Sequence, residues 1–264
     1  MILIDKMSYG RFGNQVLFFN NLVQLAAICE TDFWCAPWAG DNLFLKERQP
    51  TPKSNSSYKI MTSESLKSIT NIELKDISKN DNIIIREPCL GELFFRYDST
   101  NLNNMYKFKD YDREGNTKIA ALHFRGTDFH QWNPSAVLPF EYYVKSIEHI
   151  NEQFDDVKFK VFTDDMFLES FQKTLNYFND NSIKYFIGPD SSTGVFMNDF
   201  IDMSLCDIIV STPSTFSICA GFLGKRKYII HNKKWVKERS DLNDKFWKDL
   251  YNGGNKNYST DILL

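Results

Sequence analysis

The chain has 264 residues, of which 42% are hydrophobic and 25% are charged, and its formal net charge is -3. These proportions are typical of a globular protein, and the length allows one large α/β domain or two smaller ones. The slightly acidic balance excludes a broad surface for a phosphate backbone, so we expect no nucleic-acid partner, although a local basic pocket is still allowed.

The cysteines and the N-terminal residues indicate a protein of a reducing compartment. The five Cys form no Cys-x-x-Cys pair and show no ligand spacing with the four His, so we expect no metal site. The apolar run within residues 1–6 is too short for a signal peptide, and no stretch of about 20 apolar residues could span a membrane. We therefore expect a cytoplasmic protein without a membrane span.

The N-terminal part begins with half of a βαβ unit. The pattern predicts a strand over 2–7, a glycine turn over 8–13 and a helix with an unusually apolar face over 14–28. Further strands are predicted at 32–35 and 83–85. Between 46 and 82 the hydrophobic pattern weakens, and the Pro, Ser and Asn residues of 50–57 indicate a surface loop.

The second part alternates strands with helices. Strands are predicted at 119–124, 157–162, 183–186, 208–211 and 227–230, and helices at 139–152, 166–178, 193–205 and 214–222. This alternation predicts a doubly wound parallel sheet. A charged stretch at 108–118 separates the two parts, so we expect one domain over 1–112 and another over 113–264.

The predicted strand at 119–124 ends in polar residues that could carry chemistry. Ligands of open α/β sheets bind at the carboxyl ends of the strands. The planar guanidinium of Arg125 suits a bidentate grip on phosphate, and His123 lies on the same face of the strand. Asp128 could orient Arg125 or accept a hydrogen bond from a sugar hydroxyl. A buried salt bridge at a strand end is the alternative.

Two other segments offer sites for an anion. The turn Gly10-Arg11-Phe12-Gly13-Asn14-Gln15 leads from a strand into a helix, where backbone N–H groups can approach a ligand. Ser214, Thr215 and Ser217 open a helix directly after a strand and offer hydroxyls and N–H groups to phosphate. Taken singly, each segment also fits a structural turn or a helix cap.

Taken together, these segments resemble the motifs of the fucosyltransferase superfamily, which joins α1,2-, α1,6- and protein O-fucosyltransferases. The resemblance rests on the Gly-Arg-Phe-Gly-Asn-Gln run at 10–15, on His123-x-Arg125-x-x-Asp128, on Thr163-Asp164-Asp165 and on the block from Asp199 to Ser217. These segments follow in the expected order over most of the chain.

The resemblance implies a GT-B-like α/β fold, with two Rossmann-like lobes, parallel sheets and the active site in the cleft between them. It implies GDP-fucose as the donor substrate and no metal, with the nucleotide sugar bound by residues 113–264 and the acceptor side formed by residues 1–112. Arg125 would bind the β-phosphate, Asn14 would lie between donor and acceptor, and Asp128 completes the expected catalytic set. The residues expected to bind the nucleotide sugar are Gly13, His123, Asp165, Asp199, Ser214, Thr215 and Phe216.

The expected reaction is the transfer of L-fucose, with inversion, to a hydroxyl of a glycan or another acceptor. Transfer of another nucleotide deoxysugar such as rhamnose is one alternative. A non-catalytic nucleotide-sugar-binding protein is the other, because Gly126 stands where many relatives carry a second Arg. A dinucleotide-binding dehydrogenase fits poorly, since the glycine turn lacks a third glycine. No pattern identifies a general base among Asp41, Glu92 and Asp128.

Overall fold

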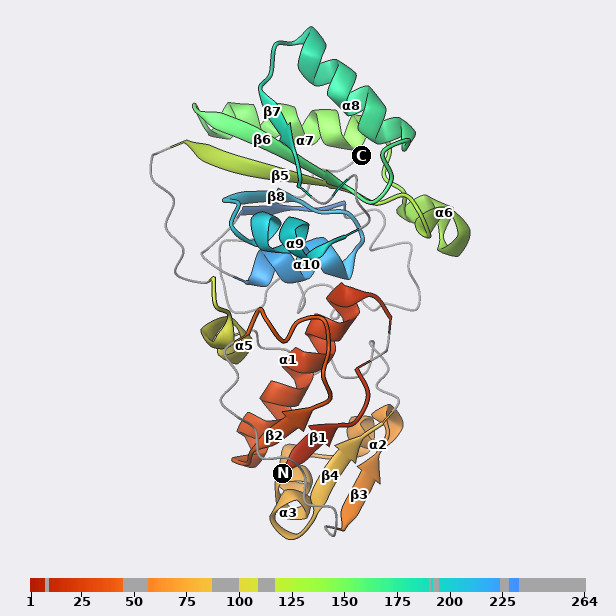
Figure 1. Cartoon of the computed structure of the whole chain (residues 1–264), viewed down its shortest axis with the longest axis vertical. Helices are drawn as coiled ribbons and strands as arrows, with labels where there is room; N and C mark the ends of the chain where they lie inside the picture. The colour runs from red at the N-terminus through yellow and green to blue at the C-terminus, as the bar shows by residue number, and fades with distance from the viewer. Residues whose placement is uncertain are drawn as a thin grey trace. The chain divides into compact units, whose positions relative to one another are not determined.

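The computed structural model describes residues 1–7, 10–44, 57–86, 100–108, 117–189, 191, 195–223 and 228–232. The chain divides into two compact units, an N-terminal unit whose described residues end at 108 and a C-terminal unit whose described residues begin at 117. Both are α/β units built on parallel sheets, as the sequence pattern predicts (Figure 1).

The N-terminal unit contains a four-stranded parallel sheet in the order β2-β1-β4-β3. Its strands are β1 (Ile2–Ile4), β2 (Phe33–Cys35), β3 (Tyr58–Met61) and β4 (Asn82–Ile85). Helix α1 (Phe12–Cys29) packs against β1, β2, α3 (Asn71–Asn80) and α5 (Thr100–Met105). The strand and long helix predicted at the N-terminus are therefore confirmed.

The stretch of weak pattern contains more structure than the sequence indicates. Strand β3 and helices α2 (Ser63–Ser68) and α3 lie there, and the sequence pattern predicted none of them. Both helices begin with capping boxes, Thr62 with Ser65 and Thr70 with Glu73. Within α3 only Leu74 is buried, so the helix lacks a row of buried apolar residues at helical spacing. Of the loop expected at 50–57, residues 50–56 lie outside the described residues, and Ser57 directly precedes β3.

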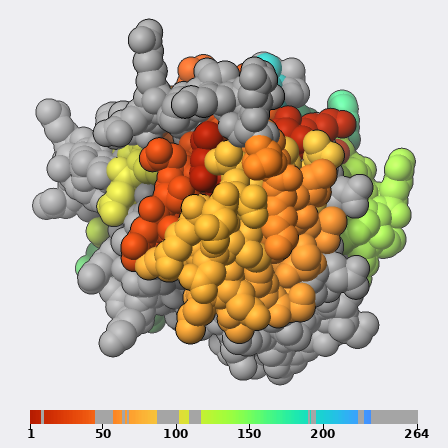
Figure 2. All heavy atoms as spheres, turned by 90° about the horizontal axis from the view of Figure 1, so that it is seen from below, coloured from red at the N-terminus to blue at the C-terminus, as the bar shows by residue number. Residues whose placement is uncertain are grey.

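Two isoleucines of the N-terminal unit are exposed: Ile60 of β3 at 53% and Ile72 of α3 at 76%. Figure 2 shows the orange and yellow atoms of residues 57–86, to which both belong, side by side. Because these apolar residues face the solvent, apolar positions in this segment do not mark its buried side, and the hydrophobic pattern is weakened.

The C-terminal unit contains a five-stranded parallel sheet in the order β7-β6-β5-β8-β9. Its strands are β5 (Lys118–Phe124), β6 (Val157–Thr163), β7 (Tyr185–Ile187), β8 (Ile208–Val210) and β9 (Tyr228–Ile230). Figure 1 shows helices on both faces of the sheet. They are α7 (Phe140–Gln153) and α8 (Glu169–Asp180) on one, and α9 (Met197–Ser204) and α10 (Thr215–Phe222) on the other. The doubly wound sheet predicted for this part is confirmed.

The strand order places a topological switch point between β5 and β8. The chain builds β6 and β7 on one side of β5 and then returns to add β8 and β9 on the other side. In doubly wound sheets the crevice at such a point, at the carboxyl ends of the strands, is where ligands bind. A short helix, α6 (Phe129–Trp132), and a single 3₁₀ turn, η2 (Pro134–Ala136), follow β5.

Two buried tyrosines of α7 hydrogen-bond to backbone carbonyls at the carboxyl ends of β5 and β8. The Tyr143 ring stacks on Phe124 with 3.9 Å between centroids, and its hydroxyl donates to the carbonyl of His123 at 3.1 Å. The Tyr142 hydroxyl donates to the carbonyl of Ser211 at 2.9 Å. Because a buried hydroxyl without a partner is costly, these bonds favour one arrangement of the ends of β5 and β8.

Within the described part of the chain, none of the helices combines the length and the apolar character needed to cross a membrane.

Candidate functional site

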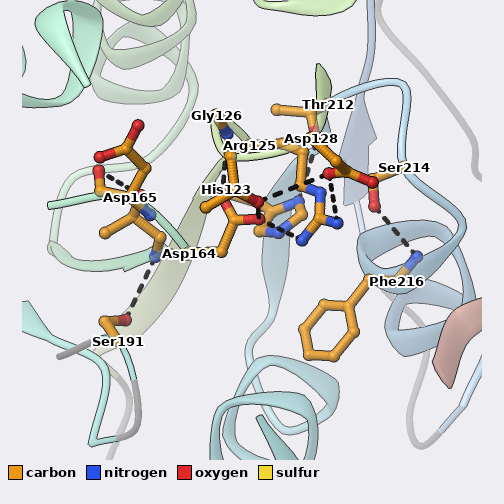
Figure 3. Close-up of polar contacts among 12 residues, drawn as sticks. His123, Arg125, Gly126, Asp128, Asp164, Asp165, Ser191, Thr212, Ser214 and Phe216 are labelled. Carbon is orange, nitrogen blue, oxygen red and sulfur yellow. Dashed lines mark hydrogen bonds and ion pairs between the residues drawn. The ribbon is translucent and has the colours of Figure 1, made fainter. Parts of the chain in front are cut away.

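Arg125 follows β5 directly and is held between two carboxylates. Its Nη2 donates to Oδ1 of Asp128 at 2.8 Å, and its Nη1 forms an ion pair with Asp164 (Figure 3). The side chain is 11% exposed, and its guanidinium carbon lies 5.3 Å from the ring centroid of Phe129. The Nε atom is buried and has no hydrogen-bond partner. The salt bridge considered from the sequence is therefore present, and it orients the one cation at this strand end.

Asp164 was given no role by the sequence analysis, although it lies in the quoted Thr163-Asp164-Asp165 motif. Its Oδ1 accepts from the backbone N of Gly126 at 2.9 Å, and its Oδ2 accepts from Oγ1 of Thr127 at 2.6 Å. The register of β5 and β6 pairs Phe124 with Thr163, so the next residues along each strand, Arg125 and Asp164, face each other. The sequence alone does not identify this pair, because the register between β5 and β6 is a property of the folded sheet.

His123 connects the two strands that border the switch point. Its Nδ1 is 2.9 Å from Oγ1 of Thr212, a hydrogen bond between β5 and the segment after β8. The imidazole stacks on Phe216, with 5.6 Å between centroids. Burial lowers the pKa of His123 from 6.5 to about 4, and the nearby charge of Asp164 only partly opposes that effect. His123 is therefore a neutral ring at pH 7.

The N-terminus of α10 meets the same strand ends. Ser214 is its N-cap, and the Ser214 hydroxyl accepts from the backbone N of Phe216 at 3.3 Å. The first turn contains no acidic side chain. A helix N-terminus carries partial positive charge and N–H groups without intrahelical acceptors, so the start at Ser214 and Thr215 suits an anionic ligand. Figure 3 shows Ser214 and Phe216 gathered with His123 and Arg125.

Asp165 and Asp199 have different partners. Oδ1 of Asp165 accepts from the backbone N of Phe167 at 3.0 Å, so this side chain closes the turn after β6. Asp199, in the first turn of α9, is 5% exposed and accepts from the hydroxyl of Ser191 at 2.9 Å. The Ser191 hydroxyl also accepts from the backbone N of Thr163. Ser191 lies in irregular chain without a pattern, so nothing in the sequence points to it.

Gly13 and Asn14 belong to the other unit, in the first turn of α1. Gly10 before them has a φ of +65°, and a Cβ there would collide with the amide of Asn14. The glycine turn is thus needed for the backbone and for the close approach of Asn14. Their expected roles toward donor and acceptor remain predictions.

The remaining candidates for chemistry are placed as follows. Asp41, in the N-terminal unit, accepts from the backbone N of Trp38 at 3.1 Å, and Glu92 lies outside the described residues. Asp128 accepts the hydrogen bond from Arg125 described above. Among the residues described, no group of three or more His, Cys, Asp and Glu is arranged to hold a metal ion.

Two parallel α/β units, with a cation, a neutral histidine and a capped helix at the switch point of one of them, define a protein of the GT-B type. The chain matches glycosyl transferase family 11 over residues 3–249 and belongs to that family. The protein is therefore an enzyme of a fucosyltransferase family.

Solved structures share the fold at low sequence identity. A crystal structure of POFUT1 in complex with GDP-fucose is 12% identical, with a TM-score of 0.53, covering 100% of this chain and 97% of that one. A POFUT1 complex with GDP is 10% identical, with a TM-score of 0.53, covering 87% and 98%. A mutant of Arabidopsis thaliana FUT1 in complex with GDP is 12% identical, with a TM-score of 0.50, covering 86% and 69%. No curated protein sequence matches this chain significantly.

Proposed function

We propose that the protein transfers L-fucose from GDP-fucose to a hydroxyl of a glycan or similar acceptor, with inversion and without a metal. Membership of glycosyl transferase family 11 supports fucosyl transfer, and GDP-fucose is the ligand of one of the solved structures that share the fold. The observation that carries the proposal for this chain is the oriented, nearly buried guanidinium of Arg125 at the switch point of the sheet.

The leaving group requires hydrogen-bond donors and a cation, which Arg125 and the start of α10 would supply. Transfer breaks the bond between the anomeric carbon of fucose and a β-phosphate oxygen, and GDP departs with the electron pair. Arg125 and the N–H groups at the start of α10 would stabilise that charge, a role that in other enzymes metal ions also fill. Ser214 and Thr215 supply hydroxyls beside those N–H groups.

The acceptor oxygen forms the new bond on the face opposite GDP, so the anomeric configuration inverts. The acceptor hydroxyl then loses its proton to a base or to solvent. The neutral ring of His123 would contact the nucleoside or sugar without bringing a charge to the leaving group. Asp128 acts through Arg125 in this scheme and keeps the guanidinium oriented.

The base of the donor would be selected by Asp199. A carboxylate accepts well from the N1–H and N2 amino donors of guanine and poorly from uracil, which offers a single ring N–H. Asp199 is nearly buried and held by Ser191, so its orientation is defined before a nucleotide arrives. Phe216, stacked on His123 and edge-on to Phe200, supplies an aromatic surface at the same point.

Calorimetric titration of the whole chain with GDP, GDP-fucose and UDP tests the donor assignment. We expect GDP and GDP-fucose to bind in the presence of EDTA, and Arg125→Ala to lower turnover on the order of 10²- to 10³-fold. Arg86→Ala is a matched control, because Arg86 also pairs with an aspartate, Asp5, but lies in the N-terminal unit. The control should bind GDP as the wild type does.

The remaining outcomes distinguish the alternatives. A preference for UDP or UDP-rhamnose would favour transfer of another deoxysugar. Tight GDP-fucose binding without release of GDP, across an acceptor screen, would favour a non-catalytic binding protein. Proton NMR of the product reports the anomeric configuration, and retention of the donor configuration would contradict an inverting mechanism.

A further inference from the structure

We propose that Asp164 is a positioning residue for the transfer reaction, which holds the guanidinium of Arg125 in place for the diphosphate of the donor. This inference rests on the proposed function, because it requires that Arg125 meets the leaving group. Asp164 would touch neither substrate. Its role would be to fix the segment that begins at Arg125 on the neighbouring strand β6.

The contacts of Asp164 come from three consecutive residues. Its carboxylate pairs with the guanidinium of Arg125, accepts from the backbone N of Gly126 at 2.9 Å and accepts from the hydroxyl of Thr127 at 2.6 Å. A carboxylate that accepts several such bonds is held tightly, and hydrogen bonds to an ionised group are stronger than neutral ones. The side chain and backbone of residues 125–127 are therefore oriented together.

The second carboxylate on Arg125 is placed differently. Asp128 lies three residues along the same segment, with its side chain 40% exposed, so it moves with Arg125 when the segment moves. Asp164 is 24% exposed and belongs to the end of a different strand, whose register with β5 is defined over seven residue pairs. Of the two carboxylates, Asp164 is the one that ties Arg125 to the sheet.

Charge alone would make Asp164 weaken GDP binding rather than strengthen it. Two carboxylates around one guanidinium leave a local charge of -1, which repels a diphosphate. If Asp164 only competed for Arg125, removing its charge would tighten GDP binding. The bonds from Gly126 and Thr127 oppose this view, because they hold the carboxylate in place independently of Arg125. The Nε atom of Arg125 is left without a hydrogen-bond partner by both carboxylates.

Whether Asp164→Asn weakens or tightens GDP binding therefore distinguishes positioning of Arg125 from competition for it. Asp164→Asn keeps the shape of the side chain and removes its charge. We expect GDP binding to weaken about 10- to 100-fold, the range typical when a group that orients a ligand-binding side chain is lost. Asp202→Asn is the matched control, since Asp202 is 29% exposed and pairs with Lys160 on a different part of the same unit. It should leave GDP binding unchanged.

A double-mutant cycle shows whether Asp164 acts through Arg125. In the Arg125→Ala background, Asp164→Asn should change GDP affinity by less than about twofold, because the group to be positioned is gone. Thr127→Val supplies a second variant if Asp164→Asn does not fold. It removes one of the bonds that hold Asp164 and should weaken GDP binding a few-fold.

If folded Asp164→Asn binds GDP as tightly as the wild type or more tightly, the positioning role is overturned. It is also overturned if Asp164→Asn lowers GDP affinity equally in the wild type and in the Arg125→Ala background. For an unfolded Asp164→Asn, unchanged binding by Thr127→Val would overturn it. The proposed function fails separately, when the wild-type chain binds no GDP at all. A thermal unfolding scan of each variant identifies those that have lost the fold.

Discussion

Gly126 lies directly against Asp165, at a distance that leaves no room for any other side chain. A Cβ at Gly126 would be 2.8 Å from both Cβ and Oδ2 of Asp165. The register that pairs Phe124 with Thr163 brings the two residues opposite each other just beyond the paired strands. A side chain at position 126 would therefore have to displace Asp165, which occupies the space that it would need.

Gly126→Ala should lower the free energy of unfolding by about 1–3 kcal/mol, the usual cost of overpacking. The added methyl group has to displace Asp165, whose carboxylate is held by the backbone N of Phe167. Urea denaturation of Gly126→Ala, of Asp165→Gly and of the double variant measures the coupling. In the double variant, the cost of the methyl group should largely disappear.

Gly221→Ala is the control for this experiment. A Cβ at Gly221 would meet the terminal methyl group of Ile229, which can turn away at little cost. A loss of stability as large as that of Gly126→Ala would indicate that the unit resists any added methyl group, and the specific conflict with Asp165 would then be disproved.

His123 should remain neutral in the folded protein down to a pH of about 4, because burial lowers its pKa from 6.5. Below pH 6.5 the unfolded chain takes up a proton at this position and the folded chain does not, so stability falls as the pH falls toward 4. For one group with this shift, the largest loss is about 3 kcal/mol. Above pH 6.5 this contribution is fully present.

NMR titration of the His ring protons tests this prediction, with His123→Gln used to assign the signal among the four histidines. We expect the His123 signal to titrate near pH 4, and the stability of His123→Gln to depend less on pH between 6.5 and 4. A signal that titrates near 6.5 would show that the ring is accessible to water.

Gly188→Ala should weaken the discrimination between guanine and hypoxanthine nucleotides. A Cβ at Gly188 would lie 2.6 Å from Oδ1 of Asp199 and 2.5 Å from the ring of Phe162, so Asp199 has to move. If Asp199 accepts from the N2 amino group of guanine, wild-type protein prefers GDP to IDP, which lacks that group. We expect a preference of at least about 10-fold in the wild type, roughly one hydrogen bond to a charged group, and a smaller one in Gly188→Ala.

Competition binding with GDP and IDP measures this preference, and Asp199→Asn serves as the comparison. Equal affinity for GDP and IDP in the wild type would contradict a role of Asp199 toward the guanine amino group. It would leave the role of Arg125 toward the diphosphate untouched.

Thr70→Ala should destabilise the N-terminal unit by about 1 kcal/mol, through loss of the capping box of α3. The Thr70 hydroxyl accepts from the backbone N of Glu73 at 3.2 Å, and the Glu73 carboxylate accepts from the backbone N of Thr70 at 2.8 Å. Ser78→Ala, in the same helix, removes only a bond to the carbonyl of Lys75 and should be close to neutral. Urea denaturation compares the two, and equal effects would show that the cap contributes nothing.

The alternating strands and helices of residues 117–232 could be predicted from the sequence, because burial on both faces of a parallel sheet demands apolar runs that are easily recognised. The same reasoning predicted that His123, Arg125 and Ser214 would lie at carboxyl strand ends or at the helix start that follows them. The segment from β3 to α3 could not be predicted in this way. Both helices begin with capping boxes, and α3 buries only Leu74, so α3 carries no strong hydrophobic period.

The sequence by itself therefore determined which residues stand at the ends of the strands, since periodicity and chain order are local properties. Only the tertiary structure decided their partners: Asp164 with Arg125, Thr212 with His123, Ser191 with Asp199 and Asp165 against Gly126. These pairs join residues 39 or more positions apart in all but one case, that of Ser191 and Asp199, eight apart. The order and register of the strands bring the distant pairs together, and Ser191 lies outside the helices and strands, so no local pattern encodes these contacts.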